Sequence, residues 1–258
     1  MPTRRRPRPL LLVAVLVPLS LLLTACRPLT PRVVDAVHPG TVSIDPEDRT
    51  PHVLDGKVNA VIDLGERVIV GGDFTQVKAF NRPEVHARRG LFAYTRSTGA
   101  IEPAFDARLD RGGVRDMVVS PDGKLIIGGS FARVGDHLSP GLAEVDGYTG
   151  LPDTGFRGAT DGWVLTMALR GDRLIVGGTF TKVAGQPRTH LAAIDARTGA
   201  IDPVLADLPV TAALRGTTNV NQLDASSDGT RLVITGNFTR VAGVLREQVA
   251  VIGLTATS

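Results

Sequence analysis

Four short runs of apolar residues along the chain share one pattern of hydrophobic and polar positions. Each run begins with a basic residue, continues with three apolar residues and ends in Gly-Gly-x-Phe, except that Thr235 replaces the first glycine of the last run. The runs occupy residues 67–74, 124–131, 173–180 and 231–238, so their phenylalanines lie 57, 49 and 58 residues apart. A period of this size indicates one supersecondary unit repeated along the chain. Three apolar residues without alternation predict a strand that is covered on both faces.

Further strands are predicted on both sides of each run. An Asp-Gly turn, clearest at residues 120–123 and 227–229, supplies the left-handed backbone that a tight hairpin needs. In three units a Thr-Gly turn leads into a fourth strand with proline near its start, which is typical of an outermost strand. The predicted first strands include residues 58–61, 114–117, 164–167 and 220–223, and the third strands are residues 91–94, 142–145, 191–194 and 249–252. Four antiparallel strands in each unit describe one blade of a β-propeller.

The glycines and phenylalanines of the runs form a structural signature. Glycine inside a strand indicates a bulge or a close approach of another backbone. The phenylalanines are expected in the core, where burial of each contributes roughly 1.5–3 kcal/mol. Phenylalanine and valine three residues apart, as in Phe-x-x-Val, do not share a face of a regular strand, so we expect a bend between them. The signature residues are Gly71, Gly72, Phe74, Gly128, Gly129, Phe131, Gly177, Gly178, Phe180, Gly236 and Phe238.

The two ends of the repeat region suggest how the units are arranged. Ile44-Asp45-Pro46 has the pattern of a fourth strand but precedes every first strand, whereas the last unit ends at Ser258 without a fourth strand. We therefore expect an all-β protein, a small β-propeller of about four four-stranded blades, with the N-terminal strand completing the last blade. Closure would remove a sheet edge that is prone to aggregation. The alternatives are an open arc that pairs with another chain and a ring with a fifth, degenerate blade.

Across residues 42–254 the sequence resembles the delta-60 repeat β-propeller family. The resemblance rests on Ile/Val-Gly-Gly-x-Phe-Thr-x-Val, on the following Leu-Ala-x-Ile/Val strand and on the Thr-Gly turn that leads to Ile-Asp-Pro. It implies a propeller, often found on exported bacterial proteins, and no established activity. The Asp195-Ala-Arg-Thr-Gly199 turn is also similar to turns of quinoprotein propellers, but the tryptophan expected shortly after it is missing. No quinone and no other cofactor is therefore expected.

The first residues predict an export signal. Four arginines precede the apolar segment 10–23, and Leu23-Thr24-Ala25-Cys26 resembles a bacterial lipobox, whose cleavage leaves a lipidated cysteine at the new N-terminus. We predict a signal peptide at 1–25, lipidation of Cys26, a proline-rich tether at 26–41 and the propeller at 42–258, with repeat cores near 58–105, 114–156, 164–205 and 220–254. The alternative is a plain signal peptide or an uncleaved anchor with an incidental cysteine.

Charge and cysteine content narrow the function further. The chain carries 29 basic and 26 acidic residues, and removal of 1–25 takes away four arginines and no acids, which changes the net charge from +3 to −1. A nucleic-acid-binding protein would need a concentrated basic surface on the mature domain, so no nucleic-acid partner is expected. With one cysteine the exported domain has no disulfide of its own, and its core alone must stabilise it.

The candidate site residues fall into two groups. A basic rim is predicted from the loops between second and third strands, and a pore lining is predicted from the first strands, where Asp116 is expected to pair with Arg115. The histidines show no paired spacing for a metal, and no catalytic residue is assigned. The rim candidates are Arg88, Arg89, His137, Arg188 and His190, and the pore candidates are Arg115, Asp116, Asn221 and Gln222.

These features favour a non-catalytic binding or scaffolding module, exported and held by its lipid at the outer surface of the bacterial envelope. Its expected partner is a protein or a glycan at the cell surface. The alternative is a propeller hydrolase or lyase that acts on cell-wall or environmental carbohydrate, with Asp116 and a rim histidine as acid and base. A structural subunit of an envelope complex is a third possibility, and it predicts a broad apolar patch.

Overall fold

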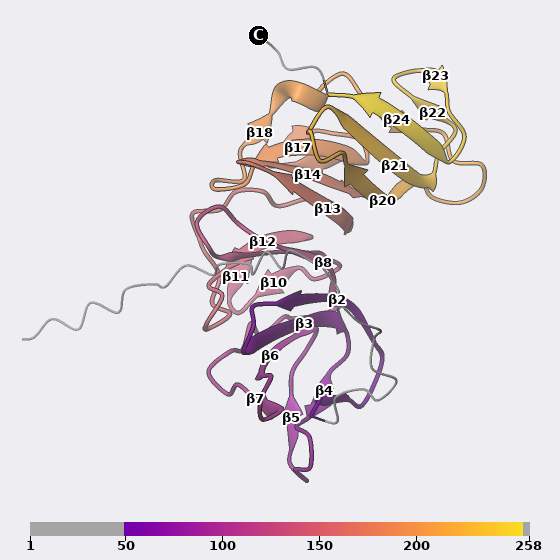
Figure 1. Ribbon diagram of the computed structural model, residues 1–258. Coiled ribbons are helices and arrows are strands. Elements are labelled where there is room, and N and C mark those ends of the chain that lie inside the picture. Colours follow the sequence, from indigo (N-terminus) through magenta and orange to yellow (C-terminus); the bar gives the residue numbers. More distant parts are fainter. Residues whose placement is uncertain (1–48, 255–258) are drawn as a thin grey trace, which may run out of the picture.

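The repeat units form four antiparallel sheets that stack face to face. The computed structural model describes residues 49–254, and within this range all regular structure is β except the 3-10 helix η1 (Pro203–Leu205). Sheet 1 lies at the bottom of Figure 1 and sheet 4 at the top. Their strands are, in sheet 1, β2 (Lys57–Asp63), β3 (Arg67–Asp73), β6 (Leu91–Thr95) and β7 (Ala100–Ile101); in sheet 2, β8 (Val114–Val119), β9 (Leu125–Gly129) and β12 (Leu142–Val145); in sheet 3, β13 (Val164–Arg170), β14 (Arg173–Gly178), β17 (Leu191–Asp195) and β18 (Ile201–Asp202); and in sheet 4, β20 (Asn219–Ala225), β21 (Arg231–Asn237) and β24 (Val249–Gly253).

The predicted strand order within a unit is confirmed. In each sheet the second strand lies between the first and the third, and a fourth strand follows in sheets 1 and 3. Sheet 2 replaces its fourth strand by a single bridge between Val145 and Pro152. Within residues 49–254, sheet 4 has no fourth strand.

The segment after each phenylalanine forms a β-hairpin, where a bend and a variable loop were expected. The valine of each Phe-x-x-Val lies in this hairpin and pairs with the segment that enters its own unit, as Val77 does with Val53 and Val241 with Val210. The hairpins are β4 (Gln76–Lys78) with β5 (Val85–Ala87), β10 (Arg133–Val134) with β11 (His137–Leu138), β15 (Lys182–Val183) with β16 (Gln186–Pro187), and β22 (Arg240–Val241) with β23 (Val244–Leu245); β1 (His52–Val53) and β19 (Val210–Thr211) are entering segments.

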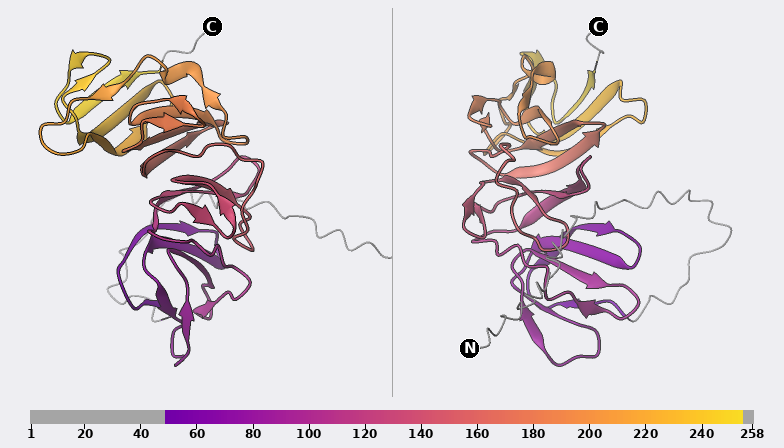
Figure 2. Two further views of the ribbon diagram at one scale, coloured as in Figure 1. Left: turned by 180° about the vertical axis from the view of Figure 1, so that it is seen from behind. Right: turned by 90° about the vertical axis from the view of Figure 1, so that its left-hand side faces the viewer.

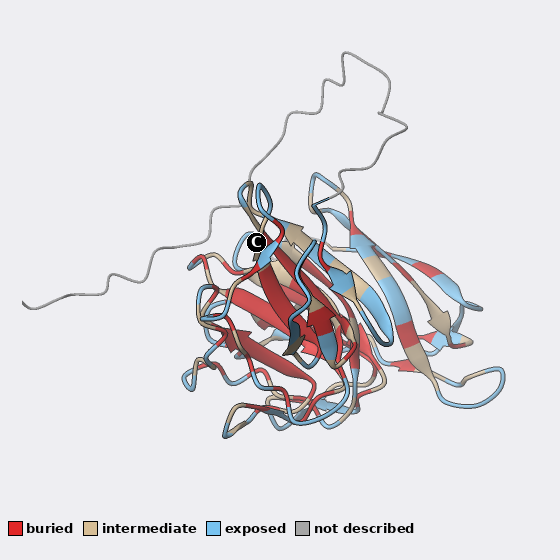
Figure 3. Ribbon diagram, turned by 90° about the horizontal axis from the view of Figure 1, so that it is seen from below, coloured by how far each residue is buried: buried red, intermediate tan, exposed pale blue. Residues whose placement is uncertain are grey.

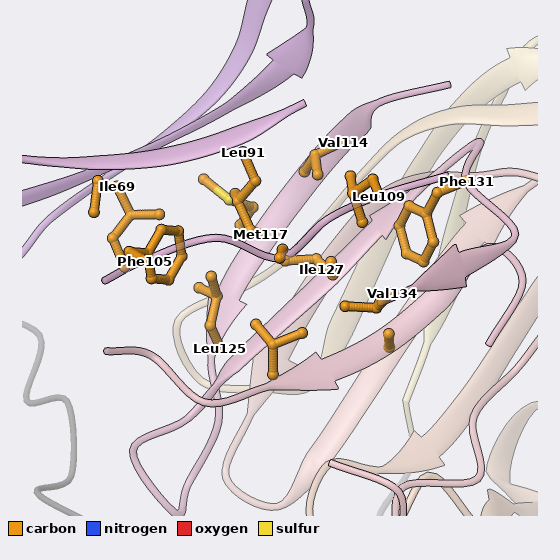
Figure 4. Packing of buried hydrophobic residues seen from close by; sticks show 14 residues of the cluster. Ile69, Leu91, Phe105, Leu109, Val114, Met117, Leu125, Ile127, Phe131 and Val134 are labelled. Carbon is orange, nitrogen blue, oxygen red and sulfur yellow. The ribbon is translucent and has the colours of Figure 1, made fainter. Parts of the chain in front are cut away.

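Apolar clusters between successive sheets hold the stack together. Figure 4 shows the cluster between sheets 1 and 2, to which Ile69 and Leu91 contribute from sheet 1 and Met117 and Ile127 from sheet 2. Similar clusters join sheet 2 to sheet 3 and sheet 3 to sheet 4. The signature phenylalanines Phe74, Phe131, Phe180 and Phe238 are all buried, which confirms the core prediction. Figure 3 shows buried residues concentrated on the strands and exposed ones mainly on loops and marginal strands.

The two glycines of the signature have different roles. The second glycine faces the bulge of its own first strand, and a Cβ there would overlap a carbonyl oxygen, such as that of Lys57 at Gly72. The first glycine makes room for the next sheet: a Cβ on Gly177 would lie 2.7 Å from Cγ1 of Val220. Gly71 and Gly128 face Val114 and Val164 in the same way, at 2.8 and 2.7 Å. Thr235 stands at this position in sheet 4, which no further sheet covers within residues 49–254.

A closed ring is not confirmed. Sheets 1 and 4 lie at opposite ends of the stack in all views of Figures 1 and 2, and no strand of one pairs with a strand of the other. The segment Ile44-Asp45-Pro46, the signal peptide, Cys26 and the tether lie outside the described residues. Within residues 49–254 the structure has no helix of the length and hydrophobicity that crossing a membrane requires.

Candidate functional site

The predicted pore residues of sheet 2 are engaged in structural contacts. The expected pair of Arg115 with Asp116 is wrong: Nη1 of Arg115 lies 2.9 Å from Oδ2 of Asp73, on the neighbouring sheet. Asp116 instead accepts the backbone N–H groups of Met117 at 2.8 Å and Met167 at 2.6 Å. Burial raises the pKa of Asp116, and these two hydrogen bonds oppose the rise without cancelling it. Asp116 therefore joins sheet 2 to sheet 3.

The other two pore candidates lie at the free end of the stack. Asn221 and Gln222 belong to β20 of sheet 4, and both are exposed. Gln222 lines an open hollow of about 340 Å³ with Asp224, Val233 and Thr235. No hydrogen bond or ion pair within residues 49–254 joins Asn221 or Gln222 to Arg115 or Asp116. The four predicted pore residues therefore do not form a single site.

Two rim arginines occupy equivalent places in their units. The backbone N–H of Arg88 donates to Thr75, and that of Arg188 donates to Thr181, at the base of the respective hairpin. Their Nη1 atoms donate to the carbonyl of the preceding residue, at 2.9 and 2.6 Å. Arg88 also donates to Pro103 O at 3.2 Å, and both Nε atoms are buried without a hydrogen-bond partner. The backbone N–H groups of Arg88 and Arg188 therefore close the hairpins, and their half-buried guanidinium groups bond nearby carbonyls, whereas Arg89 is exposed.

The two rim histidines have different surroundings, and His190 contacts the segment that enters the next unit. His190 is buried, has a φ of 65° and places Nδ1 2.8 Å from Val210 O. Burial lowers its pKa, and the bond to Val210 opposes this. Gly90 and Gly141 occupy the same left-handed position in units 1 and 2. His137 lies half-buried in β11. No group of three or more His, Cys, Asp or Glu side chains suited to a metal occurs in the described part of the chain.

Two sets of acidic side chains that stabilise the fold were not predicted from the sequence. The first set pairs with the basic residue that opens each of the first three runs: Arg67 pairs with Glu102 at 2.8 Å and Arg173 with Asp202 at 2.6 Å. Lys124 contacts Asp153 and also Glu144, whose pKa is raised by burial. An acid in the second position of Ile-Glu-Pro and Ile-Asp-Pro was the available signal.

The second set anchors three hairpins. Asp55 accepts the N–H of Thr75 and Gln76, and Asp161 accepts those of Thr181 and Lys182, each at 3.0 Å or less. Asp110 has the same role toward β10. The signal was an aspartate before glycine at 20 residues from the hairpin threonine in units 1 and 3. These carboxylates are therefore also committed to the fold.

The hairpins present one exposed arrangement repeatedly. In units 2 to 4 a basic residue stands directly across the hairpin from an apolar one, and the longer hairpin of unit 1 shows the same pair farther along. We call these pairs the hairpin row. They are Lys78 with Val85, Arg133 with Leu138, Lys182 with Pro187, and Arg240 with Leu245. Apart from half-buried Lys78, all are exposed, so the row combines positive charge with accessible apolar surface.

One family model supports a β-propeller type of repeat. A family model described as a domain of unknown function (DUF5122) beta-propeller matches residues 120–156 and 172–203. No curated protein sequence matches the chain significantly. Among solved structures, the computationally designed Ika4 protein is 11% identical, with a TM-score of 0.47 over 82% of this chain and 100% of that chain. The computationally designed Ika8 protein is 13% identical, with a TM-score of 0.42 over 75% of this chain and 45% of that chain. The chain is a repeat protein of the β-propeller type.

Proposed function

We propose that this protein is a non-catalytic binding module of the bacterial envelope, a delta-60 repeat propeller that uses its hairpin row to bind an anionic glycan. The observation that carries the proposal is the recurrence of an exposed basic residue opposite an exposed apolar residue. Asp116, Arg88 and His190 are buried or half-buried and make contacts within the fold, whereas Arg133 and Arg240 of the row are exposed and each donate to a carbonyl of their own hairpin.

The repetition suits an extended, repetitive ligand. One exposed charge gains little from an anion in water, typically less than about 1 kcal/mol. Several weak contacts to one polymer add up, because after the first contact the others form at a high effective concentration. Apolar neighbours such as Leu138 and Leu245 offer the nonpolar faces of sugar rings a surface to pack on.

The N-terminus supports a location at the membrane surface. The arginine-rich leader, the apolar segment and Leu23-Thr24-Ala25-Cys26 together suit export followed by lipidation. A lipid on Cys26 and the proline-rich segment 26–41 would hold the module a short distance from the bilayer. Cys26→Ser is expected to move the protein from the membrane fraction to the soluble one, and unchanged fractionation would contradict the anchor.

Binding is tested on an array of anionic and neutral glycans. A triple variant, Arg133→Ser with Lys182→Ser and Arg240→Ser, is expected to lose about tenfold or more of its affinity for anionic members, and the loss should shrink at high salt. The matched control changes three exposed arginines outside the hairpins, Arg111, Arg157 and Arg215, to serine. Equal loss in both triples would contradict a specific role for the row. Binding to anionic vesicles but to no glycan would point to lipid head groups instead.

A further inference from the structure

The outer face of sheet 4 exposes positions that the other sheets bury. Val233 and Val249 lie on the face opposite sheet 3 and are exposed by 40 and 54%. Their counterparts in sheet 3 are Ile175 and Leu191, which are exposed by at most 1% because sheet 4 covers them. Sheet 4 therefore presents the surface on which, elsewhere in the stack, a following sheet packs.

Sheet 1 presents the opposite half of the same interface. Val58 and Val61 of its first strand are exposed by 45 and 58%. In sheet 3 the same two positions are held by Val164 and Met167, which are buried against sheet 2. A hollow of about 390 Å³ lies beside Val61, Asp63 and Val68. The two ends of one chain thus carry the two complementary surfaces of an interface that the chain forms three times internally.

Side-chain sizes at the two ends match each other. Inside the stack a long side chain reaches over the first glycine of the preceding sheet: Sδ of Met117 lies 2.9 Å and Sδ of Met167 lies 3.2 Å from where a Cβ on Gly71 or Gly128 would stand. At the free ends both sizes are reversed. Sheet 4 has Thr235 in place of glycine, and sheet 1 has the shorter Val61 in place of methionine. The added atoms of Thr235 would therefore find room above Val61.

The two ends also carry complementary hydrogen-bonding groups. Between sheets 2 and 3, Oδ2 of Asp116 accepts the N–H of Met167, and between sheets 3 and 4, Oγ1 of Thr166 accepts the N–H of Leu223 at 3.2 Å. The acceptor position of sheet 4 is held by exposed Gln222, whose amide carries a suitable oxygen. The donor position of sheet 1 is the N–H of Val61.

We propose that two copies of this chain join head to tail, with sheet 1 of each copy packed on sheet 4 of the other. Two identical head-to-tail interfaces that close on themselves form a ring. Two copies with four sheets each give eight, the upper end of the usual range of about four to eight blades, which a third copy would exceed.

The first test is the mass of the full-length chain in mild detergent, carrying Cys26→Ser, by analytical ultracentrifugation. The expected species has twice the mass of one chain. Val61→Arg and Val249→Arg place a charge on an already exposed position and are expected to weaken association by about 100-fold or more, whereas the control Leu138→Arg, on an exposed hairpin, should leave it unchanged. A monomer at all concentrations, or chains of three or more copies, would overturn the two-copy ring.

The second test addresses the fit of the interface. Val61→Met is expected to weaken association at least tenfold through its clash with Thr235, and Thr235→Gly in the same chain should restore it by recreating the internal arrangement. Since the chain has only one natural cysteine, Cys26→Ser copies carrying Val61→Cys can be mixed with copies carrying Thr235→Cys. A disulfide between the two copies supports the ring. A disulfide formed only when both cysteines are in one monomeric chain would overturn it and support closure within the chain.

Discussion

Sheets 3 and 4 share one sequence pattern but differ in what covers them. Sheet 3 is covered on both faces, and Leu174, Ile175 and Val176 of its second strand are all fully buried. In sheet 4 the same positions hold Leu232, Val233 and Ile234, and the middle one is exposed. The positions of a unit therefore fall into two groups. Some pack inside the unit or against the sheet before it, and others pack against the sheet that follows.

Substitutions at positions that do not face the following sheet should lower stability equally in both sheets. Phe180 and Phe238 are completely buried, each in the cluster that joins its sheet to the sheet before it. Phe180→Ala and Phe238→Ala are each expected to lower the free energy of unfolding by about 3–5 kcal/mol, measured by urea denaturation. A negligible effect at Phe238 alone would show that sheet 4 is poorly packed throughout, and it would contradict the expected equality of the two sheets.

Substitutions at positions that face the following sheet should lower stability only in sheet 3. Gly177→Ala places a Cβ 2.7 Å from Val220 and is expected to cost about 1–3 kcal/mol. The matched change Thr235→Ala, measured at dilution where copies are separate, is expected to stay within about 0.5 kcal/mol. Equal losses at the two positions would mean that the first glycine is needed by its own strand.

The smallest expected effect is a loss of hairpin stability at acidic pH. Hydrogen bonds from the Thr75 side chain and from the N–H groups of Thr75 and Gln76 lower the pKa of Asp55. Partial burial would raise the pKa of Asp161, but hydrogen bonds from Thr181 and Lys182 outweigh it and lower the pKa. Because these pKa values are lower in the folded state, the stabilisation is present above the unfolded pKa, about 4, and is lost as pH falls through the folded value.

Unit 4 provides the control for this prediction. Its hairpin is anchored through Ala212 O, which accepts the Thr239 hydroxyl at 2.6 Å and does not titrate. Hydrogen exchange below pH 4 should therefore show earlier loss of protection for β4 and β15 than for β22. Simultaneous loss in all hairpins would indicate global unfolding and would contradict local anchoring by the carboxylates.

The strands and the core could be predicted because they depend on local pattern. The apolar runs, the Thr-Gly turns and the buried phenylalanines follow from spacing alone. The hairpins after Phe74 and its counterparts could not, because each pairs with a segment more than 20 residues earlier in the chain. The pairing of Arg115 was likewise predicted wrongly, since its partner Asp73 lies on another unit.

The repeat, the all-β character and the residues that pack within one unit follow from the amino-acid pattern, because short-range periodicity controls these features. The pairing of the charges, the role of the first glycine toward the next sheet and the exposed face at each end of the stack emerge from the three-dimensional arrangement. These depend on how successive units lie against each other. A pattern that reads alike in every unit therefore predicts how each unit folds, but it does not show what covers the outer faces of the first and the last.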